Sequence, residues 1–160
     1  MSIDRRDQRA LALWAATCAM RVLRFFERIA PRDNRPRAAI RAARAWARGA
    51  IGYREVRAAA LAAHAAARAV QEPRAIAAAR AAGHAAATGH VGTHAAATAI
   101  YAMKASSSAA RERAWQAQHV APRLHAVAFP RGDRDMLRID REHERERRRT
   151  AVASASVVRR

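Results

Sequence analysis

The stretch LALWAATCAMRVLRF, residues Leu11 to Phe25, decides the fold class of this chain. Its apolar stripe recurs at steps of three and four residues and consists of Leu11, Trp14, Cys18, Val22 and Phe25. Such steps place the side chains on one face of an α-helix. We therefore predict a helix over residues 4–28, with Asp4 and Asp7 near its positive N-terminal end.

Alanine accounts for 47 of the 160 residues and extends the helical prediction to most of the chain. Alanine is the best helix former, whereas strands favour β-branched and aromatic residues, which are scarce here. Proline, glycine and serine divide the pattern into further helices at residues 36–48, 53–70, 73–87, 93–105, 109–115 and 123–127. Because the connections are short, successive helices should pack antiparallel. We predict an all-α fold: a compact antiparallel bundle of about six to seven helices, with stacked helical hairpins as an alternative arrangement.

The composition changes near residue 128. Residues 1–127 form the predicted alanine-rich helical domain, whereas residues 128–160 combine Pro, Gly and mixed charges with few large apolar side chains. Such a segment buries too little apolar surface to fold firmly by itself. We expect a basic C-terminal tail that is disordered or loosely docked, in which Glu144 and Arg148 would support a transient helix.

The chain is strongly basic, with 30 Arg and one Lys against 13 acidic residues. The excess is spread along the chain, at +14 on residues 1–127 and +4 on residues 128–160. Such a field favours acidic partners, among them acidic proteins and nucleic acid. Nucleic-acid binding is kept as an alternative, although few aromatic residues accompany the arginines.

Several functional classes find no support in the sequence. The single cysteine, Cys18, excludes a disulfide framework and fits a reducing compartment. No stretch approaches 18 strongly apolar uncharged residues, and the N-terminus lacks a signal-type apolar core, so we expect a cytoplasmic protein without a membrane span. Glu27, Glu55, Glu72 and Glu112 fall on different predicted helices without a shared motif, and GxSxG, P-loop and CxxC patterns are absent. We expect no enzymatic activity.

Three histidines lie close together in the sequence, at His84, His90 and His94. On an unbroken helix, His90 and His94 would sit about 40° apart and His84 about 80° from His94. Three imidazoles on one arc would suit Zn²⁺, so a metal-dependent enzyme or metal sensor is an alternative function. Gly89 and Gly92 interrupt the helical pattern, and the HxxxH pair lacks the Glu of a metalloprotease signature. Our preferred interpretation is that these histidines bind no metal and instead hydrogen-bond across helices or line a partner site.

Six blocks of the chain carry a family resemblance, in the order Leu13–Leu23, Asp33–Arg37, Ala42–Gly49, Gly83–His94, Tyr101–Ala105 and Glu112–Gln116. In these blocks the chain resembles the immunity-protein-five-like family of short bacterial proteins, over about residues 10–120. The resemblance implies an all-helical fold and neutralisation of a toxin of a polymorphic toxin system by direct binding. It implies no catalytic residues.

We therefore expect a non-catalytic binding protein whose partner is a cognate toxin or another acidic protein. Arginine side chains would form charge-assisted contacts with such a partner. The candidate contact residues are His84, His90 and His94 near the predicted helix break, and Arg48 and Arg54 beside the glycines of the preceding break.

Overall fold

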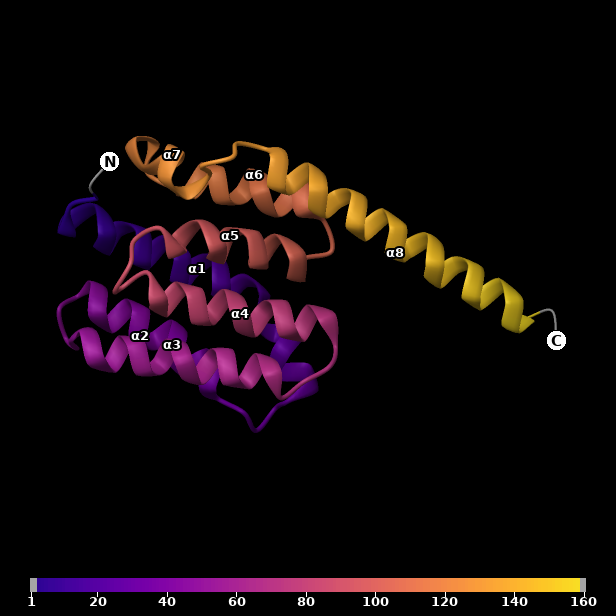
Figure 1. Cartoon of the computed structure of the whole chain (residues 1–160), viewed down its shortest axis with the longest axis horizontal. Coiled ribbons are helices and arrows are strands. Elements are labelled where there is room, and N and C mark those ends of the chain that lie inside the picture. Colours follow the sequence, from indigo (N-terminus) through magenta and orange to yellow (C-terminus); the bar gives the residue numbers. More distant parts are fainter. Residues whose placement is uncertain (1–2, 159–160) are drawn as a thin grey trace.

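The computed structural model describes residues 3–158, and no strand occurs in this range. Its helices are α1 (Arg5–Ile29), α2 (Arg35–Ala47), α3 (Tyr53–Arg68), α4 (Pro73–Ala87), α5 (His94–Ala105), α6 (Ala109–His119), the 3₁₀ helix η1 (Pro122–Leu124), α7 (His125–Ala128) and α8 (Arg134–Val158). Successive helices from α1 to α6 alternate in direction (Figure 1). The predicted all-α bundle is confirmed. None of the described helices is long and apolar enough to cross a membrane.

Polar side chains close the N-termini of several helices. The Asp4 carboxylate accepts a hydrogen bond from the backbone N–H of Asp7 at 2.7 Å. Ser108 accepts from the N–H of Arg111 at the start of α6. At the start of α4, Glu72 accepts from two N–H groups of the first turn. These side chains satisfy backbone donors that have no partner within the helix.

Helix α4 lies at the centre of the bundle and packs against α1, α2, α3 and α5. Its buried residues are Ala75, Ala77, Ala78, Ala79, Ala81, Ala82, Gly83, Ala85, Ala86 and Ala87. Arg74, Ile76, Arg80 and His84 of the same helix are partly exposed, so one stripe of α4 reaches the surface while the rest is buried. Because all of the buried side chains are small, the four surrounding helices can approach the α4 backbone closely.

The larger apolar side chains of the core come mainly from the helices around α4. The predicted stripe of α1 is buried throughout, and Leu11, Leu23 and Phe26 of this helix are among the largest fully buried side chains. Ile40 of α2 and Val56 of α3 are also fully buried. Bulky side chains on the outer helices therefore fill the space around a thin central helix.

A buried polar cluster attaches α6 to α1. The side chain of Glu112 is only 4% exposed, and its carboxylate accepts a hydrogen bond from Arg21 Nε at 3.1 Å. Gln116 donates to the same carboxylate at 3.3 Å, and its backbone carbonyl accepts from the Trp14 indole at 3.1 Å. These hydrogen bonds compensate for the burial of a charge.

The C-terminal segment is mostly helical and packs against the bundle only near its start. It contains the 25-residue helix α8, which is supported by pairs such as Glu144 with Arg148 at 2.8 Å. The first turns dock on α5 and α6, where Ile139 is buried beside Met103. From Arg145 to Ala155 the side chains are exposed, and the helix extends away from the bundle (Figure 1). Ion pairs between residues three or four positions apart stabilise this helix even where few of its side chains are buried. The division into a domain of residues 1–127 and a tail stays a prediction.

Candidate functional site

Four histidine rings from α3, α4, α5 and the α4–α5 turn form a continuous row. The ring centroids of His64 and His84 are 4.8 Å apart, and those of His84 and His94 are 5.2 Å apart. His90 follows at 5.4 Å from His94. We call these four residues the histidine row. The structure thus brings together the three histidines that the sequence singled out and adds His64 to them.

Tyrosine rings contact two members of the row, His84 in its interior and His90 at one end. The Tyr101 ring stacks on His84 at 5.3 Å with an angle of 9° between the planes. At the His90 end of the row, the rings of Tyr53 and His90 meet edge to face, with their centroids 5.8 Å apart. The aromatic contacts therefore run without a gap from α5 to the first residue of α3.

Gly83 makes room for His64 in the row. A Cβ atom at this position would lie 2.7 Å from Cε1 of His64, closer than real Cβ atoms approach other atoms. The hydrogen of Gly83 leaves that volume to the imidazole, which can then contact His84. The sequence could not reveal this role, because His64 is 19 residues away and meets Gly83 only once α3 and α4 are packed together.

The histidine row is uncharged at neutral pH. Burial lowers the pKa of His84 from 6.5 to about 3, and repulsion by His64, His94 and Arg80 acts in the same direction. Burial also lowers the pKa values of His64, His90 and His94. Burial disfavours a charged imidazole, and neighbouring cations disfavour it further.

The hydrogen bonding of the row fixes the state of its central pair. Nδ1 of His84 and Nδ1 of His94 are 3.1 Å apart, so one ring must donate its proton and the other must accept it. Nδ1 of His64 and Nδ1 of His90 are buried and have no hydrogen-bond partner within residues 3–158. The row therefore combines one internal hydrogen bond with two buried nitrogen atoms that retain unused hydrogen-bonding capacity.

The zinc alternative named His84, His90 and His94 as ligands. Within the described part of the chain, no three His, Cys, Asp or Glu side chains are arranged so that they could hold one metal ion. The Nδ1 atoms of His84 and His94 face each other rather than a shared point. A zinc site on these rings stays a hypothesis.

A hollow of about 390 Å³ lies beside the His90 end of the row. Its walls come from the start of α1, the α2–α3 turn and the α4–α5 turn, and they include Arg9, Trp46, Tyr53 and His90. We call it the bundle-end hollow. Gly49, with a φ of +77°, turns the chain at the end of α2 in a conformation that favours glycine.

The two candidate arginines lie at this same end of the bundle. Arg48 follows the last residue of α2, Arg54 is the second residue of α3, and both side chains are exposed. Neither is among the lining residues of the hollow itself, so they form part of its surroundings. Arg5, Arg9 and Arg57 are exposed as well, and none of these five guanidinium groups takes part in an ion pair of residues 3–158.

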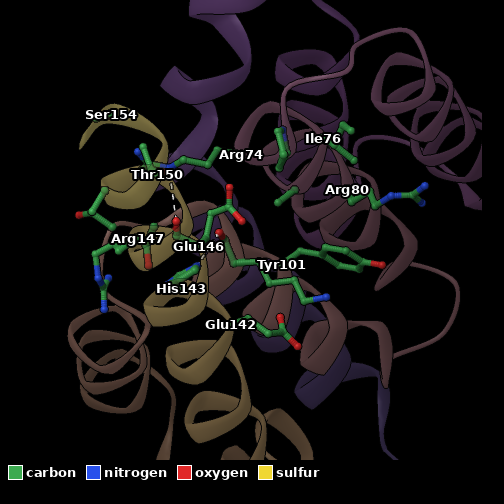
Figure 2. A pocket seen from close by; sticks show the side chains of 16 residues that line it. Arg74, Ile76, Arg80, Tyr101, Glu142, His143, Glu146, Arg147, Thr150 and Ser154 are labelled. Atoms are coloured by element: carbon green, nitrogen blue, oxygen red, sulfur yellow. Dashed lines mark hydrogen bonds between the residues drawn. The ribbon is translucent and has the colours of Figure 1, made fainter. Parts of the chain in front are cut away.

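A second, larger depression of about 920 Å³ lies between the first half of α4, the end of α5 and the outer half of α8. Figure 2 shows Ile76, Arg80 and Tyr101 on one side of it and Glu146, Thr150 and Ser154 of α8 on the other. We call it the α8 groove. This groove could not be predicted from the sequence, because it depends on the angle at which α8 leaves the bundle.

Comparison with known protein families shows the family to which the chain belongs. The model of the family described as "Imm-5 like putative immunity protein" matches residues 1–123. The chain belongs to this family. The matched residues include α1 to α6, and therefore all residues of the histidine row and of the bundle-end hollow. Searches among curated proteins and among solved structures give no match.

The contact between Gly83 and His64 predicts a mutational effect on stability that changes sign. Gly83→Ala should destabilise the otherwise unchanged chain by about 1 kcal/mol or more, because the new methyl group displaces the His64 ring. With His64→Ala already present, the same change should be neutral or stabilising by about 0.5–1 kcal/mol, because alanine is the better helix former. Urea unfolding of the four variants measures this coupling. An equal effect of Gly83→Ala in both backgrounds would contradict the proposed contact.

The lowered histidine pKa values predict that acid destabilises the protein. Between pH 6.5 and about 3, His84 is protonated in the unfolded chain but stays neutral in the folded protein. The contribution to stability is therefore complete above pH 6.5 and is lost as the pH falls toward 3. Urea unfolding from pH 7.5 to 4 should show a steeper loss for the unchanged chain than for His84→Gln. Parallel curves for the two proteins would rule out a buried neutral His84.

Proposed function

We propose that this protein neutralises a cognate toxin by direct, non-catalytic binding, and that the surface around the bundle-end hollow is the contact surface. Membership of a family of immunity proteins is the observation that carries this proposal. The family match includes every helix that builds the hollow and the histidine row. An inhibitor that covers a toxin's active site needs no catalytic residue of its own.

The shape and chemistry of this end of the bundle suit a protein interface. Tyr53 is 57% exposed and Val91 is 45% exposed, although both are apolar and lie near the hollow's two turns. Trp46 contributes to the wall of the hollow. Tyrosine, tryptophan and arginine are the residues that most often dominate binding energy at interfaces, and they act best around a concave centre.

The charge of the surface favours an acidic partner. Arg5, Arg9, Arg48, Arg54 and Arg57 are exposed and have no internal ion pair among the described residues. Unpaired guanidinium groups speed the approach of an acidic protein and can form bidentate contacts with carboxylates. The partner's matching patch should therefore be rich in Asp and Glu.

The histidine row would hold the contact surface in place. His90 lies on the wall of the hollow, and its ring packs against His94, which is hydrogen-bonded to His84 inside the bundle. A binding loop that is already ordered loses less entropy when its partner arrives. We therefore assign His84 and His94 a positioning role, and His90, Arg48 and Arg54 a role in contact with the toxin.

Co-expression with a toxin encoded next to this protein tests the proposal. The unchanged protein should rescue growth and bind the purified toxin. Arg48→Glu combined with Arg54→Glu should weaken binding at least about 10-fold, because two attractive contacts become repulsive. Arg41→Glu combined with Arg111→Glu, at exposed positions in the middle of α2 and in the first turn of α6, is the control with the same net charge.

Two results would contradict the proposal, and they can be told apart. Failure of the unchanged protein to rescue growth or to bind the toxin would refute the neutralising role. Rescue that responds equally to the two charge reversals would leave neutralisation intact and refute the bundle-end hollow as the contact surface.

A further inference from the structure

We propose that the α8 groove is a second binding site, which takes an acidic amphipathic peptide segment of a protein partner. The groove lies along residues 73–80 in the first half of α4, whereas the bundle-end hollow lies beyond the last residue of that helix. The two depressions share no lining residue. Binding in the groove does not require that the partner be a toxin.

The shape of the groove suits a peptide. One wall is formed by α4 and α5, and the other by the outer half of α8, where Glu146, Thr150 and Ser154 follow one another at intervals of four residues (Figure 2). Such intervals place these side chains on one face of α8. A trough between two helices accepts a third helix or an extended segment along its length.

The groove has a surplus of positive charge. Arg74, Arg80, Lys104 and Arg147 line it, against two carboxylates, those of Glu142 and Glu146. A row of carboxylates on a bound segment would complement this surplus, and specificity at interfaces depends on such complementarity. Charge therefore selects an acidic segment over a basic one.

Arg74 carries the most specific signal for an anionic group. Its Nε donates to the Ala105 carbonyl at 2.7 Å, but its buried Nη2 has no hydrogen-bond partner within residues 3–158. Burial lowers the pKa of this guanidinium; Glu72 opposes the effect, while Arg28 and Arg24 add to it. A buried donor without a partner is costly, so a carboxylate that reached it would be bound favourably.

The apolar part of the groove explains why the occupant should be amphipathic. Ile76 and Ala77 lie beside Tyr101, whose ring is approached by Arg80 at 6.0 Å and by Lys104 at 5.5 Å. Leucine-like side chains could cover this floor while neighbouring carboxylates meet the cations. A nucleic-acid backbone offers no row of apolar side chains to cover this floor, so the apolar lining favours the peptide.

One wall of the groove, helix α8, lies outside the part of the chain that matches the family. It lies outside residues 1–123, which match the family model, whereas the α4 and α5 wall lies inside them. The outer half of α8 has exposed side chains and therefore little internal packing to hold it against the bundle. A bound segment would supply the packing that this half of the helix lacks.

Site-specific photo-crosslinking on the full chain tests the proposal. Ser154→Cys and Val152→Cys each offer one exposed thiol for a benzophenone label, because Cys18 is fully buried and burial raises the pKa of its thiol. Ser154 lines the groove, whereas Val152, only two residues away, does not and is 70% exposed. The probe is an 18-residue helical peptide of Glu and Leu, and its Lys and Leu counterpart is the control. We expect the label at position 154 to crosslink the acidic peptide at least about five times more than the label at 152.

Affinity measurements on the same probe separate a built site from general attraction to a basic protein. Lys104→Gln combined with Arg147→Gln should weaken binding about 10-fold and leaves the packing of Arg74 untouched. Arg41→Gln combined with Arg111→Gln removes the same charge elsewhere and should have little effect.

Four outcomes would overturn the proposal. They are equal crosslinking at both positions, equal loss of affinity in both double variants, stronger crosslinking of a single-stranded oligonucleotide than of the peptide at position 154, and crosslinked dimers of this chain in place of peptide adducts. Because no toxin is used, these failures do not bear on the proposed neutralising role.

Discussion

The close packing of four helices around the small side chains of α4 is the constraint on which the rest of the structure depends. A core that is nearly all alanine along its central helix gains little from any single side chain, so its stability must come from many close contacts between backbones and Cβ atoms. The bulk that α4 lacks is supplied by its neighbours, for example by Leu11 and Phe26 of α1. This division between a thin centre and bulky surroundings fixes how far each helix can approach.

The same close packing assembles the functional surface. Gly83 continues the series of small residues in α4 and lets His64 of α3 contact His84, while α5 brings His94 into contact with the same ring. Burial among these helices keeps the histidines neutral, and the row connects the interior with the bundle-end hollow at His90. The other end of α4 faces the α8 groove. The proposed toxin-contact surface thus lies at the C-terminal end of α4, and the proposed peptide site lies along its N-terminal half.

The sequence predicted those features that depend on neighbours in the chain. The apolar stripe of α1 and most helix boundaries follow from local periodicity and breaker residues, and the structure agrees with them. The docking of Ile139 of α8 beside Met103 could not be predicted, because it is a tertiary contact that no local pattern contains. His64 was missed for the same reason, because it joins the row only through the packing of α3 on α4. Conversely, the sequence could suggest that His84, His90 and His94 lie near one another. The Nδ1 hydrogen bond between His84 and His94 and the lowered pKa of His84 depend on how the α4–α5 turn folds back.

Measuring the cost of a larger side chain inside α4 tests the central claim most directly. Ala79→Leu places three extra carbon atoms at a fully buried position of α4, whereas Ala58→Leu places them on an exposed face of α3. We predict that Ala79→Leu lowers the free energy of unfolding in urea by about 1–3 kcal/mol or more. Ala58→Leu should change it by no more than about 0.5 kcal/mol. If the two substitutions are tolerated equally well, α4 is not the closely packed centre of the bundle and the account is contradicted.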